Sequence, residues 1–372
     1  MTGRPTVLEL FSGCGGAALG LSRAGWRHLA CVEWAAAGAA TLEAAGFPAI
    51  HADVRSVDYS PFVADTTLLW ASPPCQAGST AGKRRGASDE RNGWPWTVDI
   101  IDEVQPTWLL CENVRGWTFH RKGCGGKGEG LSCIGCYWEN WILPQLRERF
   151  AFVGWWTLNA ADYGTPQFRR RVILWAGPLP LSVEPPPTTH HDVEDPAFAE
   201  LGRSRWSTIR DSIGDTLNRE SCNRRACYPC DELHGRACKE PWRIDRPAPT
   251  VTTTEEKGTR ANAVSGWTFN GGPDRASDTA FLVAGIRRVD VVEGLKLQGF
   301  PEDWPLQGNQ HQKYLQVGNA VPPQMSQAAG EAVLKAHHVH SALCSQGVDV
   351  QALSETLRRT QVTVPTSVGD AA

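Results

Sequence analysis

Short apolar runs alternate with longer Ala- and Leu-rich stretches over the first 180 residues. Each run is bounded by Gly, Pro or polar residues, which predicts strands at Val7–Leu10, His28–Glu33, Ala49–Asp53, Thr66–Ala71 and Trp108–Asn113. The stretches between them, such as Ala17–Ala24 and Ala35–Ala45, predict helices. Strands that alternate with helices favour an α/β fold with a mostly parallel sheet covered on both faces. Phe152–Asn159 and Val172–Gly177 predict two closing strands.

This alternation stops after residue 177, where Pro178 to Pro187 contains five prolines. The following stretch has no βα rhythm and carries a Cys- and Arg-rich patch. Helices are predicted again at Val289–Leu297 and Gln324–His340, before a polar tail that we expect to be poorly ordered. The predicted organisation is a catalytic and cofactor-binding domain at 1–177 with a Cys-rich insertion at about 118–137, a smaller irregular domain at 178–284, a segment at 285–340 that returns to the first domain, and a tail at 341–372.

The charge of the 372-residue chain is nearly balanced, with 37 Lys and Arg against 40 Asp and Glu. A net charge of −3 does not favour a protein that coats nucleic acid non-specifically, although it allows a local basic cleft. No apolar run approaches the ~18 residues of a membrane span, and the first residues lack a signal-peptide pattern. We therefore expect a cytoplasmic protein whose 12 cysteines are reduced thiols, serving as nucleophile or metal ligands.

A glycine-rich turn follows the first strand. Gly13, Gly15 and Gly16 allow a tight turn and a close approach of ligand to backbone, while Glu33 and Asp53 end the next two strands. Acidic residues at these places can meet ribose hydroxyls and an adenine edge. The pattern predicts a cofactor that contains adenosine, and it fits NAD as well as S-adenosylmethionine. An ordinary strand–helix turn is the alternative.

Three further segments place reactive side chains at strand ends. Cys75 follows two prolines after the fourth strand, where active sites of open α/β sheets lie, and Glu112 ends the neighbouring strand. Arg169 and Arg171 share one face of a later strand and can hold an anion or a polarised carbonyl. A buried structural cysteine, a capping glutamate and a solvated strand end fit the same three patterns.

In this order, the segments resemble those of the C5-cytosine-specific DNA methyltransferase family. The resemblance covers roughly residues 6–177 and 285–335. It rests on Phe11-Ser-Gly-Cys-Gly-Gly16, Pro73-Pro-Cys-Gln76, Glu112-Asn-Val114, Gln167-Phe-Arg-Arg-Arg171, Arg246-Pro-Ala-Pro-Thr-Val-Thr-Thr253, Leu297-Gln-Gly-Phe-Pro301 and Gly318-Asn-Ala-Val-Pro-Pro323. It implies a class I, Rossmann-like methyltransferase fold with a smaller target-recognition domain, and transfer of a methyl group from S-adenosylmethionine to C5 of a flipped cytosine in a specific duplex DNA sequence.

The resemblance also implies roles for individual residues. Cys75 would be the nucleophile that adds to C6, Glu112 would hold N3, and Arg171 with Arg169 would bind the O2 side and order the Cys75 loop. The cofactor would contact Phe11, Gly13, Gly16, Glu33, Trp34, Asp53, Val54, Pro74 and Asn319.

The chain departs from the family pattern in two places. Gly78 stands where the family usually has Phe, which loosens the nucleophile loop without removing the nucleophile. The second departure is the insertion between Trp117 and Trp138, which the family core does not need.

The expected partner is double-stranded DNA, bound by a monomer with no membrane association, encoded by a bacterium or a phage. A cognate restriction endonuclease for the same site would complete a restriction–modification system. The alternatives are a tRNA cytosine-5 methyltransferase, a catalytically silent DNA-binding relative, and an NAD-dependent oxidoreductase that the glycine turn alone supports.

Two cysteine clusters predict structural zinc. The irregular domain carries four thiols with one CxxC pair, which suits a closed tetrahedral site: Cys222, Cys227, Cys230 and Cys238. The insertion carries Cys124, Cys133 and Cys136, with His120 as the fourth ligand. Four reduced, unligated cysteines are the alternative for the first cluster, and a plain flexible glycine-rich loop is the alternative for the second.

Overall fold

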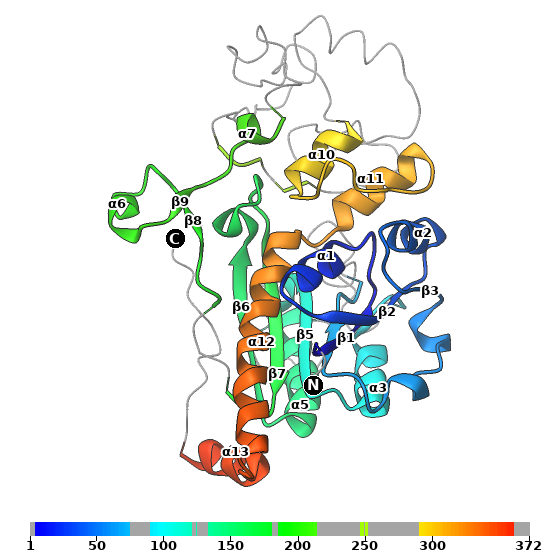
Figure 1. Ribbon diagram of the computed structural model, residues 1–372, viewed down its shortest axis with the longest axis vertical. Coiled ribbons are helices and arrows are strands. Elements are labelled where there is room, and N and C mark those ends of the chain that lie inside the picture. Colours follow the sequence, from blue (N-terminus) through cyan, green and yellow to red (C-terminus); the bar gives the residue numbers. More distant parts are fainter. Residues whose placement is uncertain are drawn as a thin grey trace, which may run out of the picture. The chain divides into compact units, whose positions relative to one another are not determined.

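The computed structural model describes residues 4–74, 90–120, 124, 133–180, 185–213, 246–248, 250–251 and 290–360 (Figure 1). Several residues singled out by the sequence lie outside this part of the chain. They are Cys75, Gly78, Cys222, Cys227, Cys230 and Cys238.

The described residues contain a seven-stranded sheet in the order β3-β2-β1-β4-β5-β7-β6. Strands β1 to β5 pair in parallel, and β7 runs antiparallel to β5. The strands are β1 Thr6–Leu10, β2 Arg27–Glu33, β3 Ala49–His51, β4 Leu68–Ala71, β5 Trp108–Val114, β6 Phe152–Asn159 and β7 Arg170–Gly177. The predicted α/β class with a mostly parallel sheet is confirmed, with strand ends that differ by a few residues.

Helices cover both faces of this sheet, because alternate residues of each strand point to opposite sides. One set of alternate residues, including Leu8 and Leu109, packs with α3 (Trp94–Val104) and α5 (Leu143–Arg149) in the main hydrophobic core. On the other face, Cys31 of β2 packs with α1 (Gly16–Arg23) and α2 (Ala36–Ala44).

The long helix α12 (Pro323–Ser345) returns to the first helix of the chain. The indole of Trp26 donates a hydrogen bond of 3.0 Å to the carbonyl oxygen of Gly330. A Cβ on Gly330 would lie 2.8 Å from the Leu21 side chain of α1, so the glycine permits the close packing of the two helices.

Short helical turns connect the larger elements. They are η1 Val54–Ser56, η2 Ser60–Phe62, η5 Arg115–Thr118, α4 Ile134–Tyr137, the π-helical turn η6 Trp138–Ile142, and η7 Ala160–Tyr163. The rings of Trp117 in η5 and Trp138 in η6 each meet the ring of Trp94 edge-on. Their centroids lie 6.0 and 5.7 Å, respectively, from that of Trp94. This aromatic cluster joins α3 to the segments on both sides of the insertion.

The chain divides into two compact units. Unit 1 comprises Met1–Leu158, Arg170–Pro187 and Ser326–Ala372, and unit 2 comprises Asn159–Arg169 and Thr188–Met325. Unit 2 thus takes in residues on both sides of the expected 178–284 domain. Its described elements are short, as the irregular sequence predicts: β8 His190–His191, α6 Phe198–Leu201, β9 Ser204–Arg205, α7 Ile209–Ile213, α10 Val291–Leu297 and α11 Gln310–Asn319.

The expectation of a poorly ordered tail from residue 341 is wrong for its first part. Helix α12 continues to Ser345, and a further helix, α13, spans Val350–Arg359. Asp349 caps α13 by accepting a 3.0 Å hydrogen bond from the Ala352 amide, and the Ser354 hydroxyl donates to the carbonyl oxygen of Pro178. A polar composition concealed this helix because only one narrow face of it is buried.

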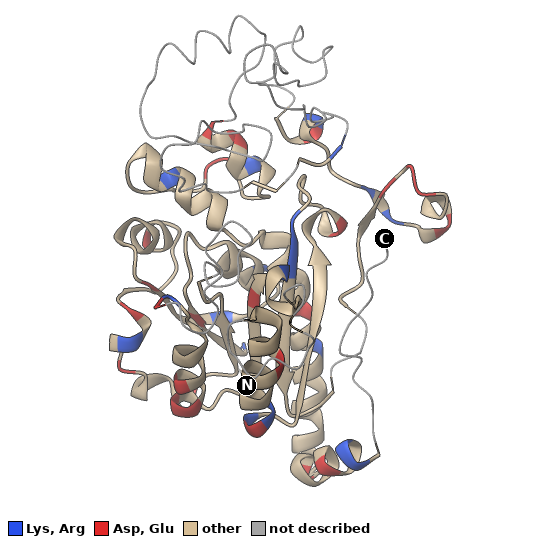
Figure 2. Cartoon of the chain, turned by 180° about the vertical axis from the view of Figure 1, so that it is seen from behind, with Lys and Arg blue, Asp and Glu red and all other residues tan. Residues whose placement is uncertain are grey.

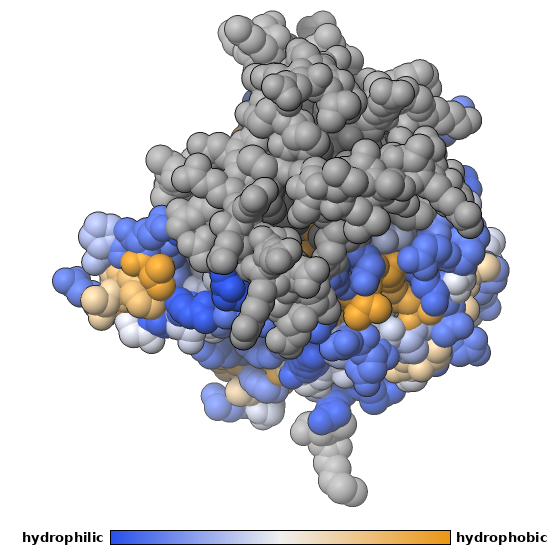
Figure 3. All heavy atoms as spheres, turned by 90° about the horizontal axis from the view of Figure 1, so that it is seen from above, coloured by the Kyte–Doolittle hydropathy of each residue, from blue (hydrophilic) through white to orange (hydrophobic). Residues whose placement is uncertain are grey.

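One face of the molecule shows the described surface coloured mostly as hydrophilic (Figure 3). In the view of Figure 3, hydrophobic side chains gather in small patches between larger hydrophilic areas. Among the described helices, none has the length and apolar character needed to cross a membrane.

Candidate functional site

The glycine turn between β1 and α1 has an unusual backbone. Phe11, Gly13 and Gly15 have φ values of 56°, 58° and 86°, and Gly16 begins α1. A Cβ on Gly13 would meet no atom within 4 Å, so the backbone conformation rather than crowding requires glycine there. Phe11 adopts such a φ without being glycine, which costs of order 1–3 kcal/mol and is typical of functional sites.

Glu33 holds this turn through its carboxylate. One oxygen accepts a 2.7 Å hydrogen bond from the Gly13 amide, and the other accepts one of 2.8 Å from the Ala35 amide. Burial raises the pKa of Glu33, and the two amides partly offset that effect. Gly38 of α2 packs against both groups, because a Cβ there would lie 2.9 Å from Glu33 Cγ and from the Gly13 carbonyl oxygen.

Two further predicted cofactor contacts lie close by in the chain. Trp34 is 75% exposed, which is unusual for a tryptophan and leaves its ring available for stacking. Asp53 caps η1 and forms an ion pair of 2.6 Å with Arg55, which lowers the pKa of Asp53 to about 2. Val54 is buried, and its carbonyl oxygen accepts a 2.9 Å hydrogen bond from the Tyr59 hydroxyl.

The chain that leads to Cys75 is held firmly as far as Pro74. The side-chain amide of Asn113 donates a 3.0 Å hydrogen bond to the Pro73 carbonyl oxygen. Gly93, at the start of α3, lies so close that a Cβ there would be 2.9 Å from atoms of both prolines and 3.2 Å from the Phe11 ring. Sequence reasoning assigned no role to Asn113 or Gly93. The position of Asn113 beside Glu112 was the one available signal.

Glu112 and Arg171 form a largely buried ion pair near the ends of their strands. Arg171 Nε lies 2.9 Å from Glu112 Oε1, and the side chains are only 12% and 11% exposed. Their strands β7 and β5 are neighbours, and β7 begins with consecutive arginines, visible as a blue stretch in Figure 2. Ala71 pairs with Cys111, so Glu112 lies at the edge from which the chain departs toward Cys75. The structure thus brings together Glu112 and Arg171.

Arg169 belongs instead to a buried hydrogen-bond network in unit 2. Its guanidinium donates to the carbonyl oxygens of Val251 and Gly318, at 2.8 and 3.0 Å. Arg169 is 3% exposed, so this side chain fixes backbone segments that are far apart in the sequence.

Gln167 and Gln298 complete that network, and both are fully buried. Gln167 donates a hydrogen bond of 3.0 Å to the Gln298 side-chain oxygen and accepts one of 2.9 Å from the Val251 amide. Gln298 donates a hydrogen bond of 2.6 Å to the Val317 carbonyl oxygen. We call Gln167, Arg169 and Gln298 with these backbone partners the motif hub. It joins four of the sequence motifs in unit 2. The sequence alone gave no sign that these residues form a structural network rather than part of the catalytic site.

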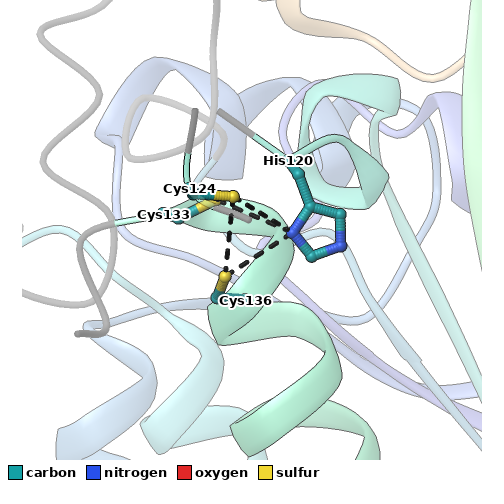
Figure 4. Close-up of side chains that lie close together, drawn as sticks. All are labelled: His120, Cys124, Cys133 and Cys136. Atoms are coloured by element: carbon teal, nitrogen blue, oxygen red, sulfur yellow. Dashed lines mark hydrogen bonds between the residues drawn. The ribbon is translucent and has the colours of Figure 1, made fainter. Parts of the chain in front are cut away.

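The insertion brings four metal-ligand side chains together in unit 1. His120, Cys124, Cys133 and Cys136 each offer one ligand atom, and these atoms all lie within 4.8 Å of one another (Figure 4). His120 turns Nδ1 toward the three sulfurs, and its Nε2 lies 3.1 Å from a carboxylate oxygen of Glu139. The hydrogen bond to Glu139 raises the pKa of His120 to about 9. Sequence reasoning missed Glu139, which has no special spacing from the cysteines.

Comparison with known proteins adds independent information. Residues 5–335 match the family described as C-5 cytosine-specific DNA methylase. The chain is 27% identical over 361 residues to the type II methyltransferase M.NgoMIV of Neisseria gonorrhoeae, covering 89% of this chain and 97% of that protein. It is 29% identical over 358 residues to the type II methyltransferase M.NaeI of Lentzea aerocolonigenes, covering 92% and 78%.

Solved structures with this fold include methyltransferases from two kingdoms of life. The S. pombe Dnmt2 methyltransferase superposes with a TM-score of 0.58 at 17% identity, over 89% of this chain and 99% of that one. A putative DNA modification methyltransferase encoded within an E. coli prophage superposes with a TM-score of 0.56 at 18% identity, over the same shares. At such identities the likeness shows the fold alone. The family match spans nearly the whole chain, and the chain therefore belongs to the C-5 cytosine-specific DNA methylases and is a DNA cytosine methyltransferase.

Proposed function

We propose that this protein transfers a methyl group from S-adenosylmethionine to C5 of a flipped cytosine in a specific sequence of duplex DNA. The observation that carries the proposal is the largely buried Glu112–Arg171 pair, at the sheet edge from which the chain continues through Pro73 and Pro74 toward Cys75. The acid lies at this edge, and the thiol follows Pro74 directly in the sequence; these are the two groups that activation of C5 requires.

The chemistry explains why a thiol is needed. C5 of cytosine is a weak nucleophile. When the Cys75 thiolate forms a bond to C6, the ring becomes an enamine, and C5 can attack the methyl group. S-adenosylmethionine supplies that methyl group on a sulfonium, whose S–CH3 bond breaks as the C5–CH3 bond forms. A base then removes the C5 proton, the electron pair re-forms the C5–C6 double bond, and the Cys75 thiolate leaves. The thiol cannot reach C6 in stacked DNA, so the base must leave the helix.

Glu112 supports this addition at N3 of the ring. Negative charge moves toward N3 as the thiolate adds, and a carboxylic proton shared with N3 stabilises the adduct. Arg171 holds the Glu112 carboxylate through the 2.9 Å ion pair and donates to the Arg170 carbonyl oxygen, and its other N–H groups would bind the O2 side of the base. Arg169 acts as a positioning residue, because its guanidinium binds the Val251 and Gly318 carbonyl oxygens.

The glycine turn fits the cofactor. Its strained backbone, the open space beside the Cβ position of Gly13 and the exposed Trp34 ring support the binding of an adenosine group at this turn. Glu33 retains acceptor capacity for ribose hydroxyls beside the two amides that it binds. Asp53 meets the adenine edge only when it shares its carboxylate with Arg55. The remaining proposed contacts are Phe11, Gly16, Val54, Pro74 and Asn319.

Target recognition is assigned to the irregular domain at 178–284, whose basic residues would contact DNA phosphates while base contacts select the sequence. The relatives M.NgoMIV and M.NaeI are type II methyltransferases. We therefore propose that this chain acts as a monomer and protects a site that a cognate restriction endonuclease would otherwise cleave.

The test is methyl transfer from labelled S-adenosylmethionine to unmethylated genomic DNA, with bulk tRNA and the Cys75→Ser variant alongside. We expect label in DNA as 5-methylcytosine, and none with the variant. Label in tRNA alone would overturn the DNA assignment. Folded protein that binds the cofactor and labels neither would overturn the proposed activity, and Gly78 would then be the first residue to restore to Phe.

A further inference from the structure

The insertion after β5 carries a cluster that DNA methylation does not explain. We propose that His120, Cys124, Cys133 and Cys136 bind one structural Zn²⁺ ion, which fixes the segment that leaves Glu112. The binding of zinc stands on its own geometry. Its effect on Glu112 rests on the proposed function.

The distances within the cluster agree with a tetrahedral site. Zinc bonds of about 2.3 Å to sulfur and 2.0–2.1 Å to nitrogen imply edges of about 3.8 Å between sulfurs and about 3.6 Å between sulfur and nitrogen. The sulfur of Cys124 lies 3.5 Å from that of Cys133 and 4.0 Å from that of Cys136. His120 Nδ1 lies 3.5–3.9 Å from the three sulfurs. All four donors therefore surround a volume that suits one ion, as Figure 4 shows.

The histidine has the orientation that a metal ligand needs. Nδ1 points toward the sulfurs, and Nε2 lies 3.1 Å from Glu139 Oε1. A proton on Nε2 that is donated to Glu139 leaves Nδ1 with its lone pair directed at the metal. Metal-bound histidines commonly have such a carboxylate partner, which fixes the tautomer and the ring plane.

Backbone packing around the cluster points to the same assignment. Cys133 and Cys136 flank the start of α4, and Gly135 lies between them. A Cβ on Gly135 would lie 2.8 Å from the backbone nitrogen of His120 and from the carbonyl carbon of Phe119. Only glycine allows the His120 backbone to approach this turn so closely, which brings the imidazole within reach of both thiols.

A disulfide does not explain this arrangement. The sulfur of Cys124 lies 3.5 Å from that of Cys133 and 4.0 Å from that of Cys136, far above the ~2.05 Å of an S–S bond. A disulfide would also account for only two of the thiols, and it would not explain why the third thiol and the imidazole lie beside them. Three thiolates and one imidazole form a standard ligand set for closed structural zinc.

The proposed zinc ligands lie close to Glu112 in the sequence, and both belong to unit 1. Glu112 lies two residues before the end of β5, η5 follows β5 directly, and His120 comes two residues after η5. Trp117 of η5 packs against Trp94, at the start of the helix whose Gly93 contacts Pro73 and Pro74. Zinc would tie η5 to α4 and thereby hold the backbone on both sides of this aromatic cluster. It would thus act as a brace for Glu112.

Zinc content tests the site directly. Native mass spectrometry and elemental analysis of the full chain should find one zinc per chain fewer in Cys136→Ser than in the wild type. The difference is decisive because Cys222, Cys227, Cys230 and Cys238 can add a second ion to both proteins. His120→Cys should keep the ion, since four thiolates also bind zinc. Cys344→Ser changes an exposed cysteine on α12 and should leave the zinc content unchanged.

X-ray absorption covers the case in which Cys136→Ser does not fold. The wild-type zinc spectrum should contain an imidazole signal beside sulfur, and His120→Cys should lack the imidazole signal. A folded wild-type chain without zinc, equal zinc in wild type and Cys136→Ser, or a spectrum of sulfur alone would overturn the proposed site.

Hydrogen exchange tests the brace separately from methyl transfer. After removal of zinc by a chelator, peptides that cover β5 and η5 should exchange faster, and peptides from β1 and β2 should not. Zinc that is present but leaves the exchange of β5 and η5 unchanged would retain the metal site and overturn its effect on Glu112. Neither result depends on catalytic activity.

Discussion

Two regions of this molecule use buried polar side chains in opposite ways. At the sheet edge of unit 1, Glu33 and Glu112 are carboxylates of low exposure. Glu33 binds two backbone amides, Glu112 pairs with Arg171, and the proposed function assigns both carboxylates to ligand binding. In the motif hub of unit 2, Gln167 and Gln298 direct their side-chain amides to protein atoms. Both regions carry family motifs, yet their side chains are committed to different partners.

The comparison separates two reasons for a motif to exist. A carboxylate that is buried beside an arginine is costly for stability, and such a group is retained for a chemical task. A buried, fully paired amide network specifies one arrangement of the backbone. We therefore expect substitutions at the sheet edge to reduce methyl transfer with little loss of stability. Substitutions in the hub should reduce stability and leave the chemistry of the folded fraction largely intact.

Glu112→Gln should have the largest effect, on the methyl transfer rate. The variant keeps the shape of the side chain but cannot share an acidic proton with N3, so kcat should fall by about 10²–10⁴-fold. Single-turnover methyl transfer measures this loss. Glu103→Gln makes the same change at an exposed position of α3 and should leave kcat unchanged. A Glu112→Gln enzyme with normal kcat would remove Glu112 from the chemistry.

Gln298→Ala should have the next largest effect, on the free energy of unfolding. The change removes one hydrogen bond from the buried side-chain amide of Gln167 and one from the Val317 carbonyl oxygen. Buried groups of this kind cost about 1–3 kcal/mol each, so the free energy of unfolding measured in urea should fall by about 2–6 kcal/mol. Gln351→Ala on the exposed side of α13 is the control and should shift the midpoint little. An unchanged midpoint for Gln298→Ala would contradict a structural role for the hub.

Gly38→Ala should weaken cofactor binding. The added methyl group would collide with Glu33 Cγ and the Gly13 carbonyl oxygen, and it would displace the turn that we assign to S-adenosylmethionine. Overpacking of this kind costs about 1–3 kcal/mol, which corresponds to roughly 5- to 150-fold weaker binding. Calorimetric titration with S-adenosylmethionine measures it. Unaltered affinity would mean that the cofactor does not depend on the geometry of this turn.

Trp34→Ala should have the smallest effect. Loss of one aromatic contact costs about 0.5–1.5 kcal/mol, so the KM for S-adenosylmethionine should rise by roughly 2- to 12-fold while kcat stays the same. Removal of another exposed hydrophobic side chain, Leu201→Ala on α6 in unit 2, should change neither constant. A fall in kcat for Trp34→Ala at saturating cofactor would assign the ring to the chemical step instead.

Much of the fold could be predicted from the sequence because it depends on local signals. Apolar runs with sharp polar boundaries predicted the strands of the sheet, and β6 agrees at both ends. Helix α3 was missed because its sequence starts with Trp94-Pro95-Trp96 and ends in acidic residues, which masks its periodicity. Helix α13 was missed because its burial is confined to residues such as Val350 and Ser354.

The candidate site was predictable only where spacing carries the information. The ligand spacing in the insertion indicated Cys124, Cys133 and Cys136, and the structure brings them together with His120. Gly135 and Glu139 gave no comparable signal, because their importance arises from contacts that form only after folding. Similarly, alternation placed Arg169 and Arg171 on one face, whereas tertiary packing gives Arg171 to Glu112 and Arg169 to the hub. Local periodicity predicts which face of a strand a side chain points to, but it does not predict where the strand begins. Because β7 begins at Arg170, the alternation does not extend to Arg169.

The most direct test of the central claim is to trap the covalent intermediate. Duplex DNA that contains the target sequence with 5-fluorocytosine accepts the thiolate and the methyl group, but fluorine cannot leave as a proton does, so the adduct persists. We predict a one-to-one complex that survives denaturation, and a cross-linked peptide in which Cys75 carries the methylated base. A complex through another residue, or release of methylated DNA without any complex, would contradict the account.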